Sequence, residues 1–100
     1  MMSKRDFSLD SEFYCTLCGN KGIPIARKGG SKREAGHLKK LFCLFCQAET
    51  NHAEVQEWTH YSYKDFKFEF DNGNFSEEGL RILSYGEFRA KMNSKGVELP

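Results

Sequence analysis

Two C-x-x-C pairs constrain this sequence more than any other feature, because they contain all four of its cysteines. Cys15 and Cys18 form the first pair, and Cys43 and Cys46 form the second. A C-x-x-C turn directs two thiolates to one point, so two turns supply the four ligands of a closed tetrahedral zinc site. Four thiolates leave no position open for water or substrate, which is typical of structural zinc. The sequence therefore predicts one structural Zn²⁺.

Disulfides are the alternative use of four cysteines, with three connectivities open. A disulfide within C-x-x-C closes a very short ring and is usually redox-active, but neither pair lies in a thioredoxin-like βαβ pattern. The N-terminal segment lacks the apolar run of a secretory signal, and no stretch approaches the ~18 apolar residues that favour a membrane span. We therefore expect a reducing, cytoplasmic setting without membrane association, in which thiols stay free to bind metal.

Strand patterns flank both cysteine pairs. Residues 13–15 lead into the first turn, and Gly19 suits the left-handed backbone that such a turn requires. Residues 37–43 lead into the second pair, and residues 50–58 leave it with apolar and polar side chains in alternation. The order of strand, turn, strand, turn and strand predicts short antiparallel strands around the metal.

Residues 15–20 and 43–46 resemble the zinc-ribbon family of small metal-binding modules, and the resemblance covers about residues 13–58. Residues 19–25 and 33–40 also resemble small zinc-ribbon proteins encoded by bacteriophages and prophages. Zinc ribbons occur in transcription, translation and replication proteins, mostly as contacts to nucleic acids or proteins. The resemblance implies a binding role and, for a phage protein, the cytoplasm of a bacterial host.

The C-terminal half predicts two or three short helices. Ser62 and Asp65 form a capping arrangement for the first, although the phenylalanines that follow also alternate with charged residues as in a strand. Ser76 suits the N-cap of a second helix, and Ser84 with Glu87 forms a capping box for another. The predicted fold is α+β, with a polar tail at 1–12, a Cys₄ zinc ribbon at 13–58 and a helical extension at 59–100 packed on the ribbon.

Charge is distributed unevenly, although the formal net charge is only +1. The insert at 27–40 carries six of the fifteen basic residues and only one acidic residue, and its glycines let a backbone approach a sugar-phosphate chain closely. RNA or another single strand is favoured over duplex DNA, since no groove-entering helix is evident. The candidate nucleic-acid contacts are Arg27, Lys28, Lys32, Arg33, His37, Lys39 and Lys40.

Other interpretations of the insert and of the aromatic residues stay open. The insert is alternatively a solvated surface that offsets the −2 charge of a Cys₄–zinc site, or a contact for an acidic protein. Four aromatic residues would stack on bases if they are exposed, and otherwise belong to the core. They are Tyr14, Phe42, Phe45 and Trp58.

Histidines and acidic residues receive plainer interpretations. His37 and His52 are expected at the surface or as hydrogen-bond donors to a ligand sulfur, because four cysteines already complete the metal site. The acidic group of Glu69, Asp71, Glu77 and Glu78 is expected to be a solvated face.

No motif of a zinc protease, P-loop enzyme, serine hydrolase or zinc deaminase occurs in the sequence. We therefore expect no enzymatic activity and no small-molecule substrate. The competing function is a phage protein-interaction module that binds and inhibits a host transcription, translation or defence complex.

Overall fold

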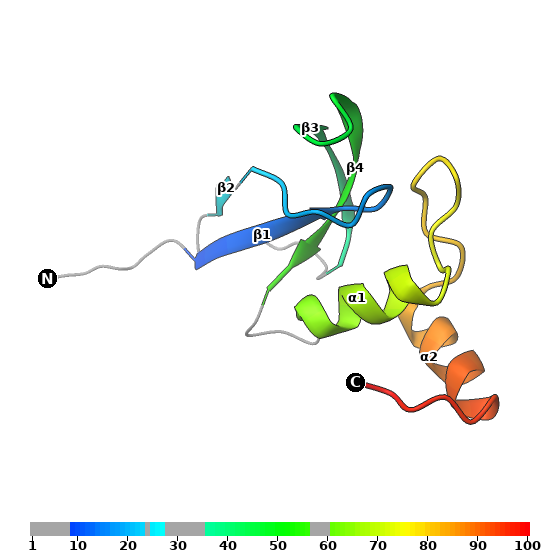
Figure 1. Cartoon of the computed structure of the whole chain (residues 1–100). Coiled ribbons are helices and arrows are strands. Elements are labelled where there is room, and N and C mark those ends of the chain that lie inside the picture. The colour runs from blue at the N-terminus through cyan, green and yellow to red at the C-terminus, as the bar shows by residue number, and fades with distance from the viewer. Residues whose placement is uncertain (1–8, 24, 28–35, 57–60) are drawn as a thin grey trace, which may run out of the picture.

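The computed structural model describes residues 9–23, 25–27, 36–56 and 61–100. An antiparallel sheet is followed along the chain by two helices, of which the first lies beside the sheet and the second lies beyond the first (Figure 1). This arrangement confirms the predicted α+β class. No helix in these residues is long and apolar enough to cross a membrane. The elements are β1 (Leu9–Cys15), β2 (Ile25–Arg27), β3 (Leu38–Cys43), β4 (Ala48–Val55), α1 (Tyr63–Asp71) and α2 (Tyr85–Ser94).

Strand order in the sheet is β2-β1-β4-β3, so β4 lies between β1 and β3. Both neighbours are antiparallel to β4, with Cys15 opposite His52 and Cys43 opposite Ala48. The C-terminal ends of β1 and β3 therefore point the same way and bring both C-x-x-C turns to one end of the sheet. Residues 9–12, which sequence patterns assign to the polar tail, form the first half of β1.

Successive side chains of β4 point to opposite faces of the sheet, and both faces are buried along residues 52–55. Ala53 and Val55 join Tyr61 and Phe66 in the apolar core, as the alternation of the sequence predicts. The opposite face is also covered, because His52 and Glu54 are fully buried.

Both predicted capping boxes begin a helix. At the start of α1 the backbone N–H of Ser62 donates to Asp65 Oδ2 at 2.7 Å, and at the start of α2 the N–H of Glu87 donates to Ser84 Oγ at 3.2 Å. The strand-like alternation in the α1 segment is thus overridden by the local cap. Helical spacing buries Phe66 on the sheet side of α1.

Ser76 does not cap a helix, so that prediction is wrong. Its Oγ accepts hydrogen bonds from the backbone N–H groups of Glu78 and Leu80, both at 3.2 Å, and closes a turn. Gly79 follows with φ +81°. A left-handed residue at this point stops a helix before its first turn is complete.

The prediction that Glu69 belongs to a solvated acidic face is also wrong, because Glu69 is fully buried. Its Oε2 accepts a hydrogen bond from Arg81 Nε at 2.9 Å, and its Oε1 accepts one from Arg81 Nη2 at 2.9 Å. Arg81 Nη1 also donates to the carbonyl of Gly36 at 2.6 Å. This bidentate pair joins α1, the segment before α2 and the chain just before β3.

Candidate metal centre

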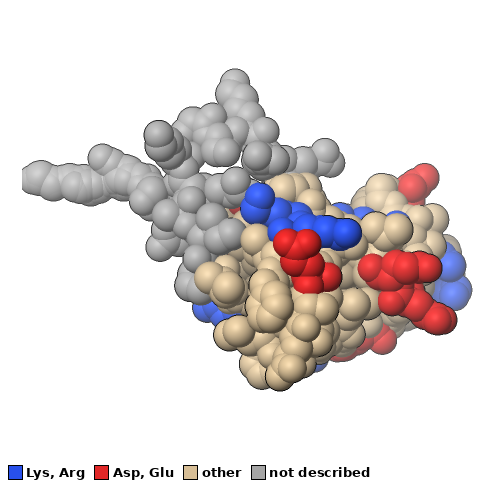
Figure 2. Space-filling model, turned by 90° about the horizontal axis from the view of Figure 1, so that it is seen from above, with Lys and Arg blue, Asp and Glu red and all other residues tan. Residues whose placement is uncertain are grey.

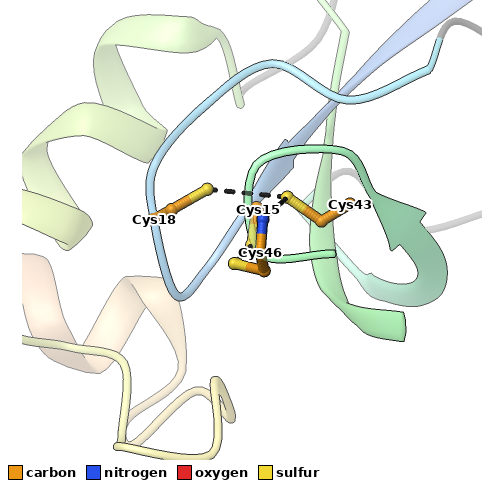
Figure 3. Close-up of side chains that lie close together, drawn as sticks. All are labelled: Cys15, Cys18, Cys43 and Cys46. Carbon is orange, nitrogen blue, oxygen red and sulfur yellow. Dashed lines mark hydrogen bonds between the residues drawn. The ribbon is translucent and has the colours of Figure 1, made fainter. Parts of the chain in front are cut away.

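The two C-x-x-C turns place their four sulfurs in one cluster. Cys15 ends β1 and Cys43 ends β3, while Cys18 and Cys46 lie one turn further along the chain (Figure 3). All four Sγ atoms lie within 4.8 Å of one another. The cross-turn distances are 3.8 Å between Cys15 and Cys46 and 3.6 Å between Cys18 and Cys43.

These distances fit a metal and not a disulfide. A tetrahedron with Zn–S bonds of ~2.3 Å has S···S edges of ~3.8 Å, whereas a disulfide holds its sulfurs ~2.05 Å apart. All four cysteines are free. The four thiols form a candidate metal site. Its donor set, four sulfurs without an oxygen or nitrogen, suits a soft divalent ion such as Zn²⁺.

The same kind of backbone hydrogen bond closes each turn, from the N–H of the fifth residue to the carbonyl of the first. The N–H of Gly19 donates to the carbonyl of Cys15 at 2.8 Å, and the N–H of Gln47 donates to that of Cys43 at 2.7 Å. Both closing residues have left-handed backbones, with φ +78° at Gly19 and φ +57° at Gln47. The first turn therefore has the residue that this geometry favours, and the second does not.

Hydrogen bonds to the sulfurs stabilise negative charge on them. The backbone N–H of Leu17 donates to Cys15 Sγ and that of Cys46 donates to Cys43 Sγ, both at 3.4 Å. Thr50 Oγ1 lies 3.0 Å from Cys15 Sγ, and both groups are buried. Once Cys15 is a thiolate ligand it has no proton to give, so the Thr50 hydroxyl is the donor of this bond.

The thiols differ in pKa because they are desolvated and lie within hydrogen-bond distance of one another. Burial acts to raise the pKa of Cys43, but hydrogen bonds from Cys46 N–H and neighbouring groups outweigh it and lower that pKa to about 7. Desolvation and then the neighbouring thiols raise the pKa of Cys46 to about 12. Desolvation also raises the pKa of Cys18. One thiolate thus disfavours the others, and a bound cation removes this penalty.

His52 is not at the surface, in contrast to one expectation for it. It is fully buried, and Nδ1 lies 3.0 Å from the carbonyl oxygen of Thr50, to which it donates. Burial lowers its pKa, so the ring is neutral. His37 Nε2 lies 2.5 Å from Glu54 Oε1. Neither histidine belongs to the cluster of four sulfurs.

The residues predicted to contact nucleic acid are divided by the sheet topology. Arg27 ends β2 at one edge of the sheet, whereas Lys39 and Lys40 lie on β3 at the other edge. Lys28, Lys32 and Arg33 lie outside the described residues. Arg27 therefore lies on a strand that is not a neighbour of the strand carrying Lys39 and Lys40.

The aromatic residues considered for stacking also divide. The ring of Tyr14 packs on α1, with its centroid 4.8 Å from that of Tyr63 and 5.3 Å from that of Phe66, so Tyr14 is part of the core. Phe42 is 47% exposed and Phe45 is 66% exposed. Trp58 lies outside the described residues.

Exposed apolar side chains gather around the two turns, a feature that charge and motif reasoning missed. We call Leu17, Phe42, Leu44, Phe45 and Leu80 the knuckle surface. Leu80 belongs to it because Thr16 Oγ1 donates to the Gly79 carbonyl at 2.7 Å and fastens residues 76–82 to the first turn. The signal available in the sequence is the apolar pair between Cys43 and Cys46.

The surface at this end of the sheet is chemically mixed. Figure 2, which looks down on the end where β3 and β4 meet, shows basic and acidic atoms side by side, with uncharged atoms covering most of the described surface around them. Lys40 lies opposite Asn51, and Phe42 lies opposite Glu49, on neighbouring strands. A continuous cationic face is thus absent from the described residues in this view.

No protein-family model matches this sequence, and no curated protein or solved structure is significantly similar to it. The interpretation of the site therefore depends on its geometry and chemistry.

Proposed function

We propose that this chain is a non-enzymatic, zinc-stabilised module of the zinc-ribbon type that binds RNA or another single-stranded nucleic acid. One observation carries the proposal: two aromatic rings, Phe42 and Phe45, are exposed beside two lysines on an edge strand. Lysines neutralise phosphates, and an exposed ring stacks on a base with ~1–3 kcal/mol per base. Together these groups match the backbone and the bases of a single strand.

The position of these side chains on β3 supports their joint use. Lys40 and Phe42 are two residues apart, so they project from the same face of the strand, ~7 Å apart along it. Among the described strands β3 has only β4 as its neighbour, so none of them pairs with its outer edge. Phe45 follows in the second turn, between two of the cysteines that would bind the metal.

Zinc is assigned a structural role in this proposal. The ion would be held by Cys15, Cys18, Cys43 and Cys46, and would cross-link the ends of β1 and β3 and supply folding energy. The chain's own contribution is to orient the sulfurs through the closed turns and their N–H donors. Replacing Cys43 and Cys46 with Ser should abolish zinc binding and unfold the ribbon. A double variant that still folds cooperatively would contradict this role.

Binding is tested by fluorescence anisotropy with labelled single-stranded RNA, single-stranded DNA and duplex DNA over a range of salt concentrations. The Lys39→Ala/Lys40→Ala variant should bind more weakly, and its log–log salt slope should fall by about 1.4, because each phosphate that a lysine neutralises on a single strand adds ~0.7 to the slope. Phe42→Ala/Phe45→Ala should weaken binding without changing the slope. Lys67→Ala is a matched control, because Lys67 lies on α1 with its side chain 58% exposed. Unchanged binding in both double variants would refute the proposal.

A protein partner is the second candidate, and the aliphatic part of the knuckle surface favours it. Leu17, Leu44 and Leu80 are exposed and offer no aromatic ring to a base. Exposed apolar patches commonly mark protein contacts. In this version the chain is a phage-encoded protein of the bacterial cytoplasm that binds and inhibits a host transcription, translation or defence complex.

A pull-down from bacterial lysate, with and without nuclease treatment, separates the two functions. Nucleic-acid binding predicts that captured material disappears on nuclease treatment. Capture of one host protein that survives nuclease and disappears in the Leu44→Asp variant would favour the protein partner instead.

A further inference from the structure

A recess opens beside the lysines of β3, between the first C-x-x-C turn, the sheet and residues 76–82. Its volume is about 280 Å³. This is slightly below the ~300–1,000 Å³ of sites for drug-sized ligands, so the recess suits a ligand of about one heterocycle. The residues that line it are Leu17, Lys40, Glu49, Thr50, Asn51, Glu78 and Leu80.

The sheet register builds one side of this recess and the turns build the others. Lys40 lies directly opposite Asn51 on the neighbouring strand, so their side chains share a face of the sheet. Leu17 comes from the first turn and Leu80 from the segment that Thr16 fastens to that turn. The aliphatic walls are therefore held by the metal centre and by a buried hydrogen bond.

Polar groups in the recess have capacity to bind a ligand. Asn51 Nδ2 makes one long contact, 3.5 Å to the backbone carbonyl of Glu78. Within the described part of the chain, Lys40 and Glu49 take part in no ion pair. The recess thus combines two aliphatic walls with an amide, an ammonium group and carboxylates.

We propose that this recess binds one unstacked nucleobase of the single strand, an inference that rests on the proposed function. A base has two apolar faces, which suit Leu17 and Leu80, and a polar rim, which suits the charged and amide groups. The carboxylates of Glu49 and Glu78 repel phosphate, so they favour a base over the backbone at this point. The phosphates of the strand would instead be bound outside the recess, by Lys39 and by the ammonium group of Lys40.

The same polar groups select among bases. Carboxylates accept hydrogen bonds from the exocyclic amino group of cytosine, and an asparagine amide pairs with adenine. Uracil and thymine carry no amino group. The site should therefore bind adenine and cytosine roughly tenfold more tightly than uracil.

The preference is tested by anisotropy with short oligonucleotides of adenosine, cytidine or uridine alone. The wild-type chain should show the tenfold preference, and Glu49→Gln/Asn51→Ala should reduce it to less than threefold. Glu77→Gln is the control, because Glu77 is an exposed carboxylate next to Glu78 that does not line the recess. Binding of all three homopolymers with equal affinity would refute base recognition by the recess and leave the proposed function intact.

A second measurement tests the recess without an oligonucleotide. Cytidine monophosphate should shift the methyl NMR signals of Leu17 and Leu80, and ribose 5-phosphate should not. If both compounds shift them, the recess recognises an anion and the inference is wrong; if neither does, it is also wrong. Shifts with cytidine monophosphate alone, in a protein that binds no oligonucleotide, would sustain the recess and refute the proposed function.

Discussion

Replacing Arg81 with Met should strongly destabilise the fold, because it removes the partner of a fully buried carboxylate. Arg81 makes two hydrogen bonds to the Glu69 carboxylate, each 2.9 Å long, and one of 2.6 Å to the Gly36 carbonyl. Tyr61 donates its hydroxyl proton to the same carboxylate. Burial and the Glu69 charge raise the pKa of Tyr61, so this hydroxyl stays protonated.

The magnitude follows from the burial of the partner. Glu69 is fully buried, so removing the guanidinium leaves an uncompensated charge in the interior, at a cost of about 3–5 kcal/mol. Methionine fills much of the aliphatic volume of arginine, and the cost in packing is therefore small. For a domain of this size each kcal/mol lowers Tm by about 4–8 °C, so Tm should fall by at least ~12 °C.

Thermal and urea unfolding of the zinc-loaded protein, followed by circular dichroism, measure this destabilisation. Arg89→Met is the matched control, because Arg89 lies 3.8 Å from Asp65 with its side chain 37% exposed, and should lower the free energy of unfolding by no more than about 1 kcal/mol. Glu69→Gln/Arg81→Met should recover part of the stability, since no unpaired charge remains. If Arg81→Met lowers the free energy of unfolding no more than Arg89→Met does, the Arg81 network does not hold α1 and the chain before β3 together.

Three further changes test the metal turns. Gly19→Ala should cost more than the ~1–2 kcal/mol of a left-handed backbone, because the new Cβ would also lie 3.0 Å from the Phe70 ring; denaturant unfolding measures it. Gln47→Gly should stabilise by about 1 kcal/mol in the same assay, because glycine removes the strain at φ +57°; a decrease in stability would show that the Gln47 side chain makes a needed interaction. Thr50→Val should lower zinc affinity about 10–100-fold in competition with a chromophoric chelator, because Cys15 loses its hydroxyl donor, whereas Thr50→Ser should retain it; equal affinities for both variants would exclude this role.

The parts of the fold that the sequence predicts well are those encoded over short distances. The C-x-x-C spacing defines the ligands, because each turn closes on itself through one backbone bond. The capping boxes at Ser62 and Ser84 work the same way, within three residues. The prediction of a helix at Ser76 was wrong because an N-cap residue starts a helix only where the following residues can be helical. Gly79, with its left-handed backbone, prevents this.

Long-range pairing explains what the sequence does not reveal. Glu69 and Arg81 are twelve positions apart and look like ordinary surface charges until α1 and the following segment fold against each other. The six basic residues of the insert all lie within residues 27–40 of the chain. Because β2 pairs with β1 while β3 pairs with β4, the two ends of the insert lie at opposite edges of the sheet.

A bound metal would also explain why apolar side chains lie exposed on so small a domain. A turn held by apolar packing must direct its large side chains inward, whereas four thiolate–metal bonds would hold these turns without them. Leu17, Leu44 and Phe45 could then face solvent on a backbone that the metal fixes. Ordering them before a partner arrives lowers the entropic cost of binding. Zinc removal should consequently abolish binding to any partner of the knuckle surface, although none of these side chains is a ligand of the ion.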